Sequence, residues 1–115
     1  MDGWDHAHPF LHAVRVQPAH IDVLAHANNI AYIGWCQDAA WRHSAALGLA
    51  PDAYQALDRA MVVRKARYEY LLAAVAGDEL EVGTWLTGSD GRLQMTRHFQ
   101  VRRGADGATL FRGDW

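Results

Sequence analysis

The stretch NNIAYIGWCQDAAWRHSAALG, residues 28–48, predicts one long helix and with it the fold. Asn28 and Asn29 are favoured at a helix N-cap, because their side chains accept a backbone N–H of the first turn. Gly48 suits the left-handed residue that follows a helix. Apolar side chains cover most of the helix circumference, and the polar stripe is narrow. A helix that is apolar on most sides is a buried helix, so other elements are expected to wrap around it.

Strands are predicted on both sides of this helix. Residues 10–19 alternate apolar and polar side chains and end near Pro18. After the helix, residues 51–57 form either a short second helix or a loop. Four strands then follow, at residues 60–71, 79–86, 93–101 and 109–115. Turns are expected at residues 76–78, at Asp90-Gly91 and at Asp106-Gly107.

This order predicts an α+β domain. Strands joined by tight turns form an antiparallel sheet with one face on the core, and the single helix is available to fill that face. We expect one domain over residues 1–115, a curved sheet of about five strands wrapped around one long central helix. The first nine residues are polar and are expected to be a loose tail.

Composition excludes several classes of protein. The formal net charge is -2, which disfavours a nucleic-acid binder. There is one cysteine, Cys36, so no internal disulfide can form. We expect no membrane association, because no apolar run approaches the roughly 20 residues that span a bilayer. No signal peptide is visible at the N-terminus, so the expected location is the cytoplasm.

The segment HIDVLAHANNIAY, residues 20–32, holds the candidate site. It resembles the signature of the 4-hydroxybenzoyl-CoA thioesterase-like family of the hotdog superfamily. That signature is Asp-x-Asp, a short loop that usually holds Gly-His, two Asn or equivalents, and an aromatic residue one turn into the helix. Asp22 matches the second Asp. The other matching positions are His26, Asn28, Asn29 and Tyr32. Residues 76–82 also resemble the family's turn into its third strand.

The chain departs from the family pattern at three places. His20 stands where the first Asp is common, which can change the local pKa or the substrate. Ala25 replaces a common Gly, so a somewhat different loop path is expected. The chain also stops at Trp115, where relatives usually continue, so we expect a last strand that is short or truncated.

The resemblance implies hydrolysis of an acyl thioester, with coenzyme A or an acyl-carrier protein as the thiol. Asp22 would be the catalytic carboxylate, acting as nucleophile or as general base. The first N–H groups of a helix lack internal partners and favour negative charge, so they can polarise a thioester carbonyl. By resemblance, the N–H at or near Asn29 does this. Relatives are at least dimers with sites between subunits, which implies a homodimer or homotetramer.

Each of these residues also has a purely structural interpretation. Asp22 could be an ordinary turn residue, and Asn28 and Asn29 could be helix caps alone. His20 and His26 could hydrogen-bond the loop or face solvent. With Asp22 they could ligate zinc, but the spacing is not a standard zinc pattern and no fourth ligand is evident. We therefore expect no metal and no cofactor.

Other residues are weaker candidates for substrate contact. Tyr32 is expected to line the core or a pocket, and Cys36 to be an inert buried thiol. Arg64, Lys65 and Arg67 form a small basic run that is either a solvated strand face or a contact for the phosphates of coenzyme A.

Two other functions remain open at this point. A hotdog dehydratase or hydratase would use a His with an acidic partner, for which His20 or His26 could serve. A non-catalytic domain that binds acyl thioesters would fit the departures at His20 and Ala25. Fold resemblance by itself does not decide among these functions.

Overall fold

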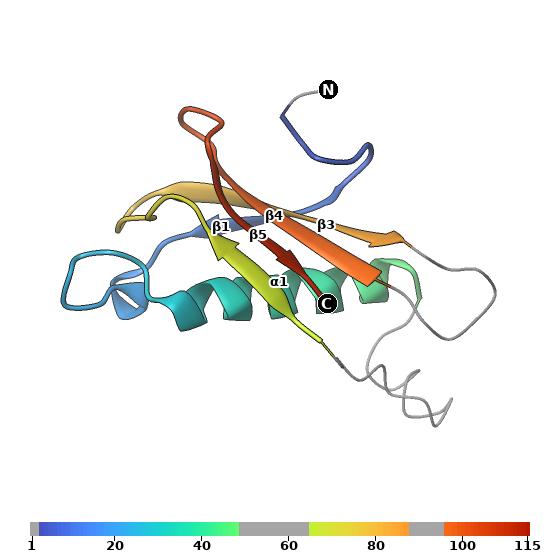
Figure 1. Ribbon diagram of the computed structural model, residues 1–115, viewed down its shortest axis with the longest axis horizontal. Helices are drawn as coiled ribbons and strands as arrows, with labels where there is room; N and C mark the ends of the chain where they lie inside the picture. Colours follow the sequence, from blue (N-terminus) through green and yellow to red (C-terminus); the bar gives the residue numbers. More distant parts are fainter. Residues whose placement is uncertain (1–2, 49–64, 88–95) are drawn as a thin grey trace.

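The computed structural model describes residues 3–48, 65–87 and 96–115 and contains one long helix against a five-stranded sheet (Figure 1). The strands are β1 (Phe10–Arg15), β2 (Arg67–Tyr70), β3 (Glu79–Thr87), β4 (Thr96–Arg103) and β5 (Thr109–Asp114). The helix α1 spans Asn29–Ala46, and a short 3-10 helix, η1, spans Pro18–His20. The sheet order is β1-β3-β4-β5-β2, and all neighbours are antiparallel. The predicted α+β arrangement is confirmed.

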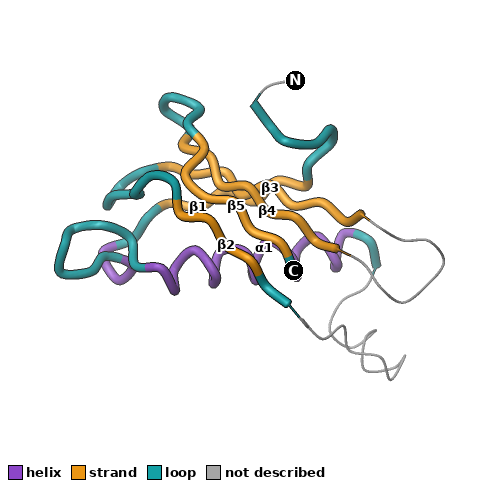
Figure 2. Tube along the Cα trace, viewed as in Figure 1, coloured by secondary structure: helices purple, strands orange, loops and turns teal. Residues whose placement is uncertain are grey.

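The ends of α1 follow the sequence signals. The Ala31 N–H donates to the Asn28 side-chain oxygen at 2.8 Å, which makes Asn28 the N-cap. Gly48 follows the helix with a φ of +81°, as expected for a residue that stops a helix. One face of α1 lies on the sheet (Figure 2), and Trp35, Cys36 and Ala39 on that face are buried.

The expectation that α1 is covered on most sides is wrong for the single chain. Ile30 is 79% exposed, Leu47 55% and Trp41 51%. The sheet covers one side of the helix and leaves the opposite side open. The composition of a helix indicates how much of its surface is apolar, but it does not indicate whether the same chain supplies the cover.

The core lies between α1 and the inner face of the sheet. It is built from alternating strand residues, as the sequence pattern predicts. Val82, Phe99, Val101 and Phe111 are fully or almost fully buried. Phe111 lies at the centre of an aromatic cluster, which we define as Tyr32, Tyr68, Tyr70 and Phe111.

Two predicted turns are confirmed. Gly77 and Gly107 have φ values of +85° and +70°, and each lies within its predicted turn. The first predicted strand is shorter than expected. β1 ends at Arg15, and Pro18 begins the 3-10 helix η1 in place of ending a strand. The expected hairpin at Asp90-Gly91, the segment 51–57 and the first part of the second predicted strand lie outside the described residues.

The prediction of a loose N-terminal tail is wrong for the part of residues 3–9 that contacts the sheet. The Asp5 carboxylate accepts from the Arg112 guanidinium at 2.6 and 3.1 Å, and its N–H donates to the Gln100 side chain at 2.8 Å. The Trp4 ring occupies space that Gly83 leaves open, since a Cβ at Gly83 would lie 2.7 Å from it. The segment therefore packs on the outer face, where polar strand residues supply its partners.

Within the described residues, no helix is both long enough and apolar enough to cross a membrane.

Candidate functional site

The loop before α1 is closed at its base and brings Asp22 close to the start of the helix. Ile21 and Ala27 form an antiparallel bridge. One step further along, the Asp22 N–H donates to the His26 carbonyl at 2.9 Å. Asp22 thus lies opposite His26, which is three residues before the first helical residue, Asn29. The sequence spacing already allowed a loop to fold Asp22 back beside the helix start, and these hydrogen bonds are what hold it there.

The Asp22 carboxylate has two backbone donors within its own loop. Its Oδ1 accepts from the Leu24 N–H at 2.8 Å and from the His26 N–H at 3.4 Å. Asp22 therefore does serve as a turn residue, as the structural interpretation proposed. The side chain is exposed, and no donor contacts Oδ2 within the described residues. Oδ2 is free to act on a substrate or on water.

Asn28 ties this loop to the helix. Its N–H and its side-chain amide both donate to the His20 carbonyl, at 2.8 and 3.1 Å. Its side-chain oxygen caps the Ala31 N–H. In the described part of the chain, the N–H groups of Asn29 and Ile30 donate to no group, and both residues are exposed. The helix thus begins with two free amides, where its dipole favours negative charge.

The two histidines differ in their surroundings. The His20 Nδ1 accepts from the Gln17 N–H at 3.0 Å, and the His20 ring lies edge-on to Trp35 at 5.2 Å. Accepting at Nδ1 places the proton of the neutral ring on Nε2. His20 therefore holds the entry to the loop. The His26 side chain is exposed and contacts none of the described residues through a hydrogen bond.

Tyr32 and Cys36 lie in the core and not on the surface of the site. Tyr32 is 2% exposed, and its hydroxyl accepts from the Ala74 N–H at 3.0 Å. Burial raises the pKa of the Tyr32 hydroxyl. Burial also raises the pKa of the Cys36 thiol, which is fully buried and therefore unsuited to nucleophilic attack.

Lys65 of the basic run lies away from this loop. Lys65 is exposed and precedes β2, and Arg64 lies outside the described residues. Tyr70, at the other end of β2, contacts the helix start. Lys65 is five residues before Tyr70, or roughly 17 Å along extended chain. It can reach only a distant part of a substrate held at the helix start.

Ala25 has a φ of +63°, the left-handed conformation that favours glycine. A glycine would adopt this backbone conformation without strain. We expect Ala25→Gly to raise the free energy of unfolding by roughly 0.5–1 kcal/mol, since relief of left-handed strain exceeds the entropy that glycine adds to the unfolded chain. Urea denaturation measures this change.

Ala105→Gly is the matched control for that substitution. Ala105 is also exposed in a turn, but it does not have a positive φ, so glycine should lower stability there. Equal loss of stability in both variants would contradict the strain at Ala25.

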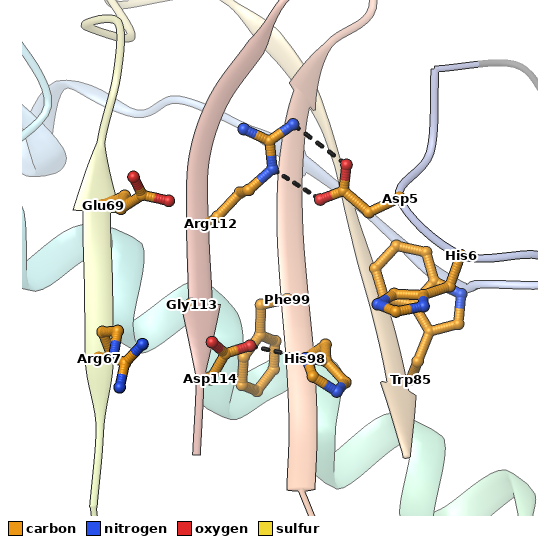
Figure 3. Close-up of a pocket in the computed structure, with 10 residues that line it drawn as sticks. All are labelled: Asp5, His6, Arg67, Glu69, Trp85, His98, Phe99, Arg112, Gly113 and Asp114. Atoms are coloured by element: carbon orange, nitrogen blue, oxygen red, sulfur yellow. Dashed lines mark hydrogen bonds and ion pairs between the residues drawn. The ribbon is translucent and has the colours of Figure 1, made fainter. Parts of the chain in front are cut away.

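A second group of polar residues lies on the outer face of the sheet (Figure 3). His98 bonds the Asp114 carboxylate at 2.7 Å and the Thr87 hydroxyl at 2.8 Å, while Arg112 pairs with Asp5. The sequence predicted strands at residues 93–101 and 109–115 but no site on them. The carboxylates and cations here are mostly paired with each other. Such pairing is typical of an ordinary polar surface and does not by itself indicate a site.

The structure has the hotdog fold, as comparison with solved structures shows. A 1,4-dihydroxy-2-naphthoyl-CoA thioesterase from Synechocystis aligns with a TM-score of 0.82 and 16% identity, over 93% of this chain and 78% of that one. A protein from Staphylococcus aureus in complex with CoA aligns with a TM-score of 0.84 and 19% identity, over 93% and 66%. A Thermus thermophilus thioesterase complexed with coenzyme A and Zn aligns with a TM-score of 0.75 and 23% identity, over 90% and 73%.

The family is shown by the sequence itself. Residues 16–112 match the model of the thioesterase-like superfamily. The chain belongs to this superfamily, and the resemblance drawn from residues 20–32 is confirmed. No curated protein matches the chain at a significant level.

Proposed function

We propose that this protein hydrolyses an acyl thioester to a free carboxylic acid and a thiol. One observation carries the proposal. The exposed Asp22 carboxylate and the free N–H groups of Asn29 and Ile30 lie at the two ends of one short loop. The thioester carbonyl oxygen would accept hydrogen bonds from the Asn29 and Ile30 amides. Those donors would stabilise the negative charge that develops on the oxygen during attack.

Asp22 would act from the loop in one of two ways. As a nucleophile, its carboxylate oxygen adds to the carbonyl carbon, the C–S bond breaks, and water then hydrolyses the mixed anhydride. As a general base, it takes a proton from water, the hydroxide adds to the carbon, and the proton passes to the leaving sulfur. Both routes consume one water and release an acid and a thiol.

For the substrate we propose a coenzyme A or acyl-carrier-protein thioester. Family membership supports this class, and two of the similar structures are described with coenzyme A bound. Lys65, and Arg64 with it, would contact phosphates at the far end of the thiol arm. His20 and Asn28 would hold the loop around the acyl group, and the exposed His26 side chain would contact the substrate. Tyr32 would support the loop from the core.

We further propose that the protein forms a homodimer or homotetramer. Strand β2 is an edge of the sheet. Its last residue, Tyr70, and the next two residues, Leu71 and Leu72, have exposed apolar side chains. An unpaired edge with apolar side chains is a surface that a second copy can cover. The exposed side of α1, with Ile30, Trp41 and Leu47, would provide a second contact in a tetramer.

The test is thiol release from a panel of aromatic, short-chain and long-chain acyl-CoA esters and one acyl-carrier-protein thioester. We expect release of thiol and of free acid in equal amounts. Light scattering on the same sample should give at least twice the monomer mass of 12.8 kDa. Water addition to an enoyl thioester without thiol release would instead favour a hydratase. Saturable binding without turnover across the panel would favour the non-catalytic domain.

A further inference from the structure

The hydroxyl of Tyr70 joins the edge of the sheet to the first residue of α1. It donates to the Asn29 carbonyl oxygen at 3.2 Å, across 41 residues of sequence. The helix itself packs most closely on β1 and β3, at the other side of the sheet. Strand β2 lies at the opposite edge, so the Tyr70 hydroxyl fixes the start of α1 from the side away from β1, next to the Tyr32 ring.

This bond acts on the peptide unit that would bind the substrate. The Asn29 carbonyl belongs to the same peptide as the Ile30 N–H, one of the two free amides at the helix start. A donor on a peptide carbonyl polarises the N–H of that peptide and fixes its plane. An oxyanion donor must lie about 2.7–3.1 Å from the developing charge. A misplacement of about 1 Å can reduce the rate about 100-fold.

We propose that Tyr70 is a positioning residue that orients the Ile30 amide for binding of the thioester oxyanion, an inference that rests on the proposed hydrolase function. The Tyr70 ring is held independently of its hydroxyl by edge-to-face contacts. Its centroid lies 5.4 Å from that of Tyr32 and 5.1 Å from that of Phe111. Tyr70→Phe therefore removes one hydrogen bond and keeps the aromatic packing.

Tyr68 provides a matched control on the same strand and the same face of the sheet. Its ring also stacks on Phe111, with ring centroids 5.6 Å apart. Its hydroxyl also has a hydrogen-bond partner, because it accepts from the Trp115 indole N–H at 2.8 Å. That bond joins two parts of the sheet region and does not reach α1. Tyr68→Phe thus removes a comparable hydrogen bond without affecting the helix start.

The experiment compares kcat and KM of wild type, Tyr70→Phe and Tyr68→Phe on the best substrate of the panel. We expect Tyr70→Phe to lower kcat about 10-fold with less than a two-fold change in KM, and Tyr68→Phe to keep kcat within two-fold. The Ile30 amide proton resonance should move upfield in Tyr70→Phe alone, because its peptide carbonyl loses a donor. This shift is a readout that general destabilisation would not produce.

Several outcomes would overturn the proposal. An unchanged kcat in Tyr70→Phe, an equal loss in both variants, or a rise in KM alone would each remove the positioning role while leaving the hydrolase function standing. An unmoved Ile30 resonance would show that the bond does not act on this peptide. A wild type that hydrolyses no thioester would overturn the proposed function, and the positioning role with it.

Discussion

Replacing Asp22 with Asn is expected to lower kcat for thioester hydrolysis by roughly 10²–10⁴-fold, the range for loss of a positioned acid or base. An amide can neither attack the carbonyl nor accept a proton from water at neutral pH. The Asn oxygen can still accept from the Leu24 N–H, the 2.8 Å bond that shapes the loop. The melting temperature of the variant should therefore lie within a few degrees of that of wild type. Thiol release measures the change in kcat.

Asp106→Asn is the control for this prediction. The Asp106 carboxylate also accepts from the N–H two residues ahead, that of Ala108, at 3.0 Å in an exposed turn. It lies in the β4–β5 turn and not in the loop before α1. Asp106→Asn should keep full activity. Full activity in Asp22→Asn would refute the role of Asp22, and equal losses in both variants would trace the effect to turn stability.

Replacing Phe111 with Ala is expected to lower the free energy of unfolding by about 3–5 kcal/mol. Phe111 is fully buried, and its ring contacts Tyr32, Tyr68 and Tyr70 at 5.1–5.6 Å. Removing it leaves a cavity between α1, β2 and β5 that rigid aromatic neighbours cannot fill. Since domains are stable by about 5–15 kcal/mol, this is a large share of the total. Urea denaturation followed by tryptophan fluorescence measures it.

The control is Leu11→Ala on β1. Leu11 is 46% exposed, so its removal should lower stability by about 1 kcal/mol or less. A loss in Phe111→Ala no greater than in Leu11→Ala would show that the aromatic cluster does not hold the edge strand to the helix.

Local patterns were sufficient for most of the secondary structure, because each pattern acts on neighbouring residues. Asn28 and Gly48 bound the helix at both ends. The period of two in residues 79–86 predicted β3, and the glycines at 77 and 107 mark turns that need a positive φ. The alternation predicts a strand that ends near Pro18, whereas Pro18 begins the 3-10 helix η1.

The candidate site was predicted only as far as one contiguous segment. Residues 20–32 contain Asp22, the capping Asn28 and the helix start together, so their proximity follows from the chain. Tyr70 is 41 residues beyond Asn29, and in the sequence it is one more alternating strand residue. Its contact with the helix depends on the pairing of β2 with β5, for which the sequence carries no local signal.

The sequence by itself thus determined the elements and the family and made Asp22 the candidate carboxylate, since caps, alternation and a contiguous motif are local properties. Tertiary structure decided which side of α1 is covered, how the N-terminal segment packs on the outer face, and which side chain reaches the free amides at the helix start. Those outcomes depend on strand order and on contacts between distant residues, which form only when the sheet closes over the helix.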